Sequence, residues 1–364
     1  MRARPSLTTL LVLLATAGVL RAAEPVTNVV LVTTDGLRGQ EVFSGAEERL
    51  LGKQGGVEDP AALRRAFWRP TPEARRETLL PFLWTVVARE GQIYGNAARG
   101  SAARVTNGHN FSYPGYNELL TGVADPRVDS NDKRPNPNVT VLEWLNGRPG
   151  YRGRVAAYCS WDVFPFIINR ERSGVVVNAA ADPVPAAGRS DLAMLNRLLA
   201  DTTPLSTGVR YDSFTFAAAL EHLRSQQPRV LYVGLGDTDE WAHAGRYDHY
   251  LEAAHRFDRF VGELWQELQR TEGYRGRTSL VITTDHGRGG GADWKHHGAK
   301  VRGAQSIWIA VLGPSTPALG ERANAKPVTQ AQVAATVAAL LGEDYVAAAP
   351  AAAPPIEDAL KRER

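Results

Sequence analysis

The sequence has only one cysteine, Cys159, in 364 residues, so no disulfide can form within the chain. If the protein is exported, the lack of disulfides fits a bacterial periplasm better than a eukaryotic secretory route. A strong net charge is also absent. The formal charge is +3, and Arg2, Arg4 and Arg21 carry that excess within an N-terminal segment that has no acid. The rest of the chain is near neutral, which gives no electrostatic reason to expect a nucleic acid partner.

Long hydrophobic runs are missing as well, except at the N-terminus. There a basic start precedes an apolar run from about Leu7 to Leu20, and Ala22 and Ala23 precede Glu24. The run is short for a membrane span of ~20 residues, and the order of features is typical of a secretory signal. We therefore expect residues 1–23 to be a signal peptide, the protein to be periplasmic or secreted, and no stable membrane span to remain after cleavage. An uncleaved anchor is the alternative.

Short β-branched runs alternate with helical patterns along the chain. The runs lie at 28–34, 153–159, 229–235, 279–284 and 306–313, and helical patterns include 212–226, 250–270 and 329–342. Such alternation favours an α/β fold with a mostly parallel central sheet flanked by helices on both faces. We expect one catalytic domain over 24–346, with a helical insertion or cap at 38–100. The Ala/Pro-rich tail at 347–364 is expected to have little fixed structure.

Acidic residues follow three of the predicted strands. Asp35 follows the first, Asp237 and Asp239 follow the run at 229–235, and Asp285-His286 follows the run at 279–284. Each acid alone is typical of a turn, but the carboxyl ends of parallel strands meet at one edge, where α/β folds bind ligands. Together they therefore indicate a site.

The spacing of histidines near these acids favours a metal. Asp239 and His243 are four residues apart and would share one face of a helical turn. Glycines at 287–291 let the backbone turn tightly and bring "KHHG" back toward the same edge. Carboxylate and imidazole together suit Zn²⁺ and other first-row metals. No Gly-Lys-Ser/Thr follows the glycines, which excludes a phosphate-binding loop of that type.

Ser112 is the candidate nucleophile. It begins "SYPGYNELLTG", which reads as the start of a helix with proline in its first turn. A serine there could simply cap the helix, but it would also lie in the positive field of the helix N-terminus. That field stabilises an alkoxide and the phosphate that it attacks.

Taken together, these residues resemble the alkaline phosphatase superfamily, most closely its nucleotide pyrophosphatase/phosphodiesterase branch. The likeness rests on five motifs in the family's order within residues 28–313: Asp35 after the first strand, "SYPGYNELLTG", "DTDEWAH", "DHG" at 285–287, and His297-Gly298. The separation of Asp35 and Ser112 is longer than expected for the branch, so the 38–100 insertion is expected to shape substrate access.

The resemblance implies a two-metal site and a phosphoserine intermediate. One ion would be held by Asp35, Ser112, Asp285 and His286, and the other by Asp239, His243 and His297. Both ions would most often be Zn²⁺, with Mn²⁺ or Fe possible. Two metals ~3.5–4 Å apart can clamp the attacking and leaving oxygens of a displacement at phosphorus.

Two details of the implied site rest on choices between neighbours. The branch has an asparagine that holds a phosphate oxygen, and Asn131 is the candidate, with Asn136 and Asn138 as rivals and a plain turn as the alternative. Of the two adjacent histidines, we expect only His297 to be a ligand, because consecutive side chains of an extended segment point to opposite sides. His296 would then face solvent or support the site indirectly.

The expected activity is hydrolysis of a small-molecule phosphate ester, as a phosphodiesterase or phosphatase. Sulfatases share the implied fold, but the fourth residue after Ser112 is Tyr116 rather than the arginine of their signature. The alternatives are a sulfatase-like hydrolase without formylglycine and a catalytically inactive metal-binding protein. Lys133 hints at a monoester substrate, whereas Trp161, Phe164, Phe166 and Trp241 hint at a diester.

Overall fold

The computed structural model describes residues 25–204 and 206–361. The predicted signal peptide at 1–23 lies outside the described residues. Within them, no helix is both long enough and apolar enough to cross a membrane.

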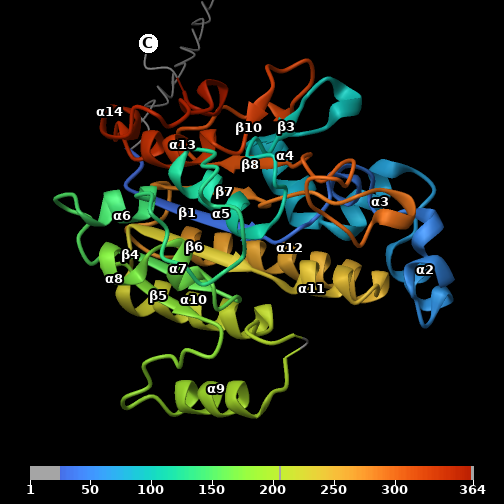
Figure 1. Ribbon diagram of the computed structural model, residues 1–364, viewed down its shortest axis with the longest axis horizontal. Coiled ribbons are helices and arrows are strands. Elements are labelled where there is room, and N and C mark those ends of the chain that lie inside the picture. Colours follow the sequence, from blue (N-terminus) through green and yellow to red (C-terminus); the bar gives the residue numbers. More distant parts are fainter. Residues whose placement is uncertain (1–24, 205, 362–364) are drawn as a thin grey trace, which may run out of the picture.

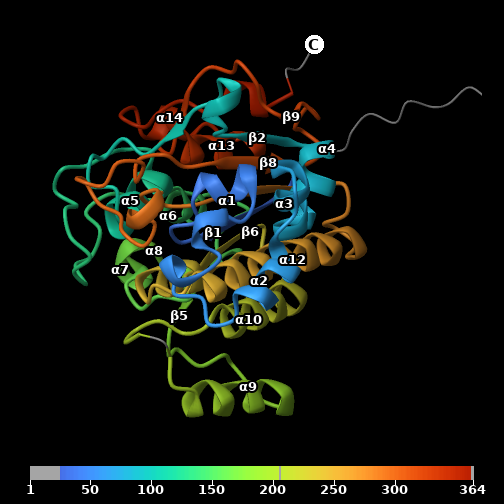
Figure 2. The same cartoon turned by 90° about the vertical axis from the view of Figure 1, so that its right-hand side faces the viewer.

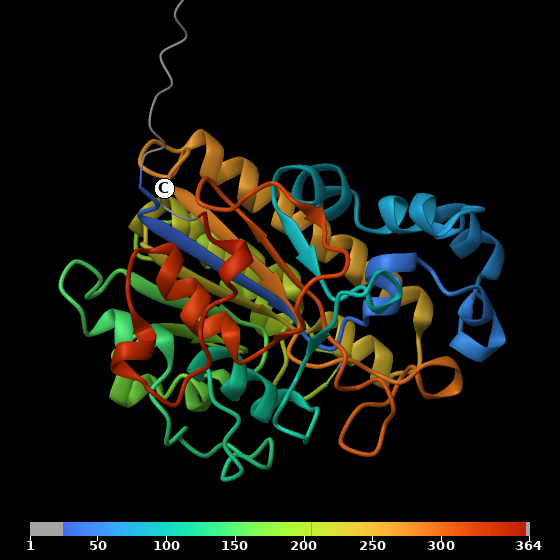
Figure 3. The ribbon, with the colours of Figure 1, turned by 90° about the horizontal axis from the view of Figure 1, so that it is seen from above.

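The fold is built on a central sheet of eight strands in the order β5-β4-β6-β1-β7-β8-β2-β9 (Figures 1 and 3). Its strands are β1 (Asn28–Thr34), β2 (Gln92–Tyr94), β4 (Val155–Cys159), β5 (Val176–Ala179), β6 (Val230–Leu235), β7 (Thr278–Thr283), β8 (Ile309–Leu312) and β9 (Gly320–Glu321). Only β8 runs antiparallel to its neighbours, and every other pair is parallel. The prediction of a mostly parallel sheet is confirmed. A separate small sheet pairs β3 (Ala103–Arg104) with β10 (Val328–Thr329).

Helices cover both faces of the central sheet, as predicted, because alternate strand residues are buried on opposite sides. Val30 and Val32 belong to one hydrophobic cluster, with side chains from α3, α10 and α12, whereas Val29 and Leu31 belong to the other, with α5, α6 and α13. Figures 1 and 2 show these two layers. The helices are α1 (Gly39–Ser44), α2 (Pro60–Phe67), α3 (Pro72–Leu79), α4 (Ala88–Glu90), α5 (Ser112–Thr121), α6 (Val141–Asn146), α7 (Phe164–Ile167), α8 (Arg170–Ser173), α9 (Ser190–Asp201), α10 (Asp212–Gln226), α11 (Asp237–His243), α12 (Tyr247–Arg270), α13 (Gln332–Leu340) and α14 (Tyr345–Ala348).

Two segments differ from the sequence-based expectation. The region 38–100 is mostly helical, but its residues 92–94 form β2, which pairs with β8 and β9 and so belongs to the central sheet. The expectation of little fixed structure at the C-terminus is wrong for residues 347–361. Ala352, Ile356 and Ala359 are buried in the cluster with α13, because a chain rich in alanine can still bury its methyl groups against a neighbouring helix.

Candidate metal centre

The three acidic strand ends meet at one point, because β6, β1 and β7 are neighbours in the sheet. His286 lies at the centre of this group. Its Nε2 is 3.2 Å from Asp35 Oδ1, 3.4 Å from Asp285 Oδ2 and 3.9 Å from Asp239 Oδ1. Asp285 and His286 are fully buried, so these side chains line an interior site rather than a solvated turn.

The histidines predicted for a second ion lie beside this group. α11 begins just after β6 and places Asp239 and His243 on one face, with His243 Nε2 3.2 Å from Asp239 Oδ2. The loop after β7 then brings His297 Nε2 within 3.0 Å of His243 Nε2 and 3.8 Å of Asp239 Oδ1. His296 is exposed. The structure thus brings together all the predicted metal ligands of both ions.

The grouping of ligands differs in one respect from what the resemblance implied. Two sets of donor atoms lie close enough together for one ion each: Asp35, Asp285 and His286 form one, and Asp239, His286 and His297 form the other. His286 therefore lies between the two sets, where its ring stacks on that of His297 with centroids 4.0 Å apart.

Ser112 is buried at the first position of α5, and its Oγ is 3.5 Å from His286 Nε2. The residue before it, Phe111, occupies the N-cap position, and no side-chain cap bond is formed there. The alternative that Ser112 merely caps α5 is therefore wrong. Its hydroxyl faces the acidic and imidazole cluster instead.

Asn131 lies against the same helix start, with its Oδ1 accepting a hydrogen bond of 2.9 Å from the amide of Tyr113. Its rivals have structural partners: Asn136 donates to Asn117 and to the carbonyl of Ile167, and Asn138 donates to Asn117 and Asp125. Of the three, Asn131 is the one that contacts the first turn of α5.

Two residues at the centre were not predicted. The hydroxyl of the fully buried Tyr116 donates to Asp35 Oδ2 at 3.0 Å. Burial, with Asp285 and Asp35 nearby, holds the pKa of Tyr116 well above its usual range, so the phenol stays a donor. A signal was present in the sequence, because Tyr116 is four residues after Ser112 and so shares its helix face.

Arg288 is the second unpredicted residue. Its fully buried guanidinium pairs with the carboxylate of Asp239 and donates to the carbonyls of Gly36 at 3.2 Å and Lys295 at 2.9 Å. It therefore ties together the turn after β1, the start of α11 and the loop that carries His297. Its place directly after Asp285-His286-Gly287 was the only hint in the sequence.

The electrostatics of the centre fit bound cations. Burial and the neighbouring Asp35 raise the pKa of Asp285 well above its usual range. Burial opposes a charged His286, but Asp285 and Asp35 outweigh it and raise its pKa to about 9. Burial and the nearby His286, Arg288 and His243 lower the pKa of His297, which keeps its ring neutral as a metal ligand requires.

The hydrogen bonding also fits. Apart from their ion pairs with His286, the buried atoms Asp35 Oδ1 and Asp285 Oδ2 have no hydrogen-bond partner, which is costly for carboxylate oxygens unless a cation binds them. Oxygen and imidazole nitrogen donors at this spacing match the ligands of first-row divalent metals.

Comparison with known proteins agrees with this centre. The model of the Metalloenzyme superfamily matches residues 206–344, which include Asp239, His243, Asp285, His286 and His297. The alkaline phosphatase PafA is similar in structure, with a TM-score of 0.59 over 93% of this chain and 100% of that chain, at 11% identity. The chain thus has the fold of an alkaline phosphatase, and its residues 206–344 resemble the Metalloenzyme superfamily. The comparison with curated proteins gave no significant match.

Other structures similar to this chain are named for different substrates. A phosphonate monoester hydrolase from Silicibacter pomeroyi matches with a TM-score of 0.57 and 14% identity, over 93% of this chain and 77% of its own. The lipoteichoic acid synthase LtaP from Listeria monocytogenes matches with a TM-score of 0.56 and 12% identity, over 87% and 72%. At such identities the likeness shows the fold, and the substrate has to be argued from the site.

Proposed function

We propose that this protein is a member of the alkaline phosphatase superfamily and hydrolyses phosphoric esters through a phosphoserine intermediate at a two-metal site. The observation that carries the proposal is the position of Ser112. Its hydroxyl lies at the start of α5, 3.5 Å from His286, the residue at the centre of the acidic cluster. The finer assignment to the nucleotide pyrophosphatase/phosphodiesterase branch rests on the order of the sequence motifs.

The ligand sets fit two divalent ions, most often Zn²⁺, with Mn²⁺ or Fe as the alternatives. Asp35, Asp285 and His286 would hold one beside Ser112, and Asp239, His243 and His297 would hold the other. When bound, such ions stabilise the charge on the attacking and leaving oxygens and favour deprotonation of a coordinated hydroxyl. Arg288 would fix the orientation of Asp239, and Tyr116 that of Asp35.

The residues of the chain would perform the reaction in two displacements. Ser112 Oγ gives up its proton and attacks phosphorus, its bond to phosphorus forms as the bond to the ester oxygen breaks, and the departing oxygen takes up a proton. Water then attacks the phosphoserine, which frees Ser112 and releases the phosphate product. The backbone amide of Ser112 and the side-chain NH₂ group of Asn131 would bind the phosphate oxygens.

The test compares Ser112→Ala with a matched control, Ser225→Ala, which lies exposed near the end of α10. We expect Ser112→Ala to fold, to bind metal and to lose activity by a factor on the order of 10³ or more. Activity is measured with p-nitrophenyl phosphate, bis(p-nitrophenyl) phosphate and p-nitrophenyl sulfate in the presence of Zn²⁺ or Mn²⁺. Mass spectrometry of acid-quenched enzyme should find phosphate on Ser112.

Three outcomes would contradict the proposal. A Ser112→Ala variant that keeps its rate would show that the serine has a structural role only. Turnover of the sulfate ester alone would favour the sulfatase-like alternative, and no turnover of any ester would favour an inactive metal-binding protein.

We also propose that the protein is exported, on the strength of the N-terminal sequence pattern. N-terminal sequencing of protein recovered from the periplasm or the medium tests this. A chain that still begins at Met1 there would exclude signal cleavage.

A further inference from the structure

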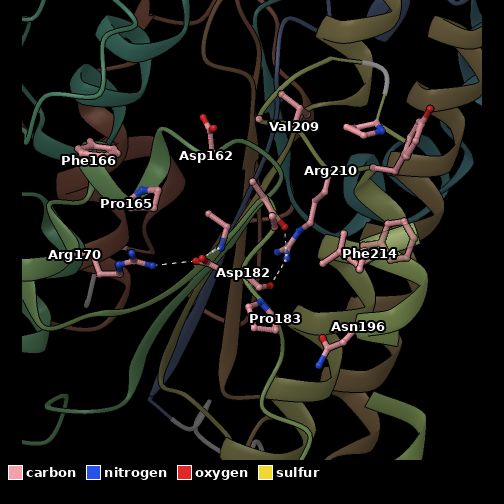
Figure 4. A pocket seen from close by; sticks show the side chains of 18 of the residues that line it. Asp162, Pro165, Phe166, Arg170, Asp182, Pro183, Asn196, Val209, Arg210 and Phe214 are labelled. Carbon is pink, nitrogen blue, oxygen red and sulfur yellow. Dashed lines mark hydrogen bonds and ion pairs between the residues drawn. The ribbon is translucent and has the colours of Figure 1, made fainter. Parts of the chain in front are cut away.

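A large cavity lies next to the proposed active site and is not explained by it. Its volume is about 800 Å³, and it lies between residues that follow β4 and β5 and the segments 181–204, which carries α9, and 206–210. Figure 1 shows the segment with α9 leaving the body of the fold, and Figure 4 shows the cavity from close by.

Hydrogen bonds connect the wall of the cavity to the start of α5. Tyr113, the residue after Ser112, donates its hydroxyl to the carbonyl of Phe166 at 3.3 Å, and Phe166 lines the cavity. Lys133, two residues after Asn131, pairs at 2.6 Å with Asp162, which also lines it. These contacts link the cavity to the neighbours of Ser112 and Asn131, where we put the phosphate group. The cavity also lies at the carboxyl ends of β4 and β5, on the sheet edge that carries the metal centre.

The walls of the cavity are largely apolar. Phe166 and Pro165 lie on one side of it and Phe214 on the other, as Figure 4 shows. Pro135, Leu199 and Val209 also belong to this apolar lining. Such walls favour an uncharged organic group, which loses its contact with water on entering.

The cations that line the cavity already have partners. Arg170 pairs with Asp182 at 3.0 Å. The buried guanidinium of Arg210 donates to the hydroxyl of Thr215 and to the backbone carbonyls of Asn178 and Ala180 at the end of β5. Glu171 is a further charged lining residue, and it is an exposed acid that would repel an anion. A second phosphate or a sulfate would therefore find no free positive partner among these residues.

We propose that this cavity binds a bulky, uncharged, apolar ester group of the substrate, so that the enzyme prefers phosphodiesters carrying such a group. This rests on the proposed function. The apolar group occupies the cavity while the phosphate lies at Ser112, and binding energy from the group then contributes to the rate at phosphorus.

The experiment uses two neighbouring leucines of α9. Leu199 lines the cavity, whereas Leu198 is 51% exposed and does not, so Leu198→Trp is the matched control for Leu199→Trp. Both are assayed with p-nitrophenyl methyl phosphate and p-nitrophenyl 1-naphthyl phosphate, which release the same p-nitrophenol. Wild-type enzyme should prefer the naphthyl ester, and Leu199→Trp should reduce that preference in kcat/KM by about tenfold or more. Leu198→Trp should leave it unchanged.

An unchanged preference in Leu199→Trp would overturn the inference, as would a wild-type preference for the methyl ester. If Leu199→Trp fails to fold, Ala200→Trp serves instead, because Ala200 also lines the cavity and is exposed. If no ester is turned over, the proposed function fails. The cavity is then tested with the neutral fluorescent probe N-phenyl-1-naphthylamine, which should bind Leu198→Trp but not Leu199→Trp. Absence of binding to the wild type would refute the cavity's role.

Discussion

Replacing His297 with alanine should remove one metal ion from the centre, whereas the same change at His296 should not. His297 is 13% exposed, and its Nε2 lies 3.0 Å from that of His243. The exposed His296 instead uses its backbone, donating to the carbonyl of Asp293 at 2.8 Å and accepting from Gly289 at 3.0 Å. Alanine can make both of these backbone bonds.

The expected size of the effect follows from the number of ligands. Zinc sites with four protein ligands have apparent binding free energies of about 10–16 kcal/mol, so one ligand accounts for about 2.5–4 kcal/mol. His297→Ala should therefore lower the affinity for one ion by a factor of about 10² to 10³, since each tenfold change corresponds to about 1.4 kcal/mol. Activity should fall with the loss of that ion.

The assay is a titration of each variant with Zn²⁺ against a competing chelator, together with elemental analysis of dialysed protein. Wild type and His296→Ala should retain two equivalents, as expected of a paired-metal site, and His297→Ala about one. Metal loss in His296→Ala alone would refute the assignment. Equal losses of metal in the two variants would mean that both rings contact the metals. No loss of metal in either variant would mean that the loop after β7 contributes no ligand.

Two further predictions concern the surroundings of the centre. Gly36→Ala should lower the free energy of unfolding by about 1–2 kcal/mol, because Gly36 has a φ of 62°. It should also weaken metal binding, because the new Cβ would lie 2.7 Å from Arg288 Nε and 3.0 Å from Asp239 Oδ1. Gly39→Ala, whose Cβ would lie 3.7 Å from the Phe43 ring, is the control, and equal effects in urea unfolding and zinc titration would refute the reasoning. Burial raises the pKa of Asp258 from 3.8 to about 7, against hydrogen bonds from Phe82 and Leu83. The folded state thus holds the proton more tightly, and part of the free energy of unfolding is lost as the pH rises from about 4 to about 7. Asp258→Asn should remove that loss in urea unfolding of chelator-treated protein, and an unaltered pH profile would show that this carboxyl does not contribute to it.

The amino-acid sequence by itself determined the local elements and the types of ligand. β-branched runs are strands because their side chains pack on a pleated surface, and the runs at 28–34 and 229–235 are indeed β1 and β6. The four-residue spacing of Asp239 and His243 placed them on one helix face, since that spacing is close to one helical turn. The acids after three strands pointed to a site at one edge of a parallel sheet.

Only the tertiary structure decided which of these residues meet. The order β6-β1-β7 brings Asp239, Asp35 and Asp285 together, and such order depends on packing between segments far apart in sequence. The same packing put residues 92–94 into the central sheet as β2 and buried Ile356 of the alanine-rich tail. The same packing also places the guanidinium of Arg288 against Asp239, which is 49 residues away in the sequence. Propensity and periodicity describe residues that are close along the chain. Contacts between distant segments form only when the chain folds and helices cover the two hydrophobic faces of the sheet.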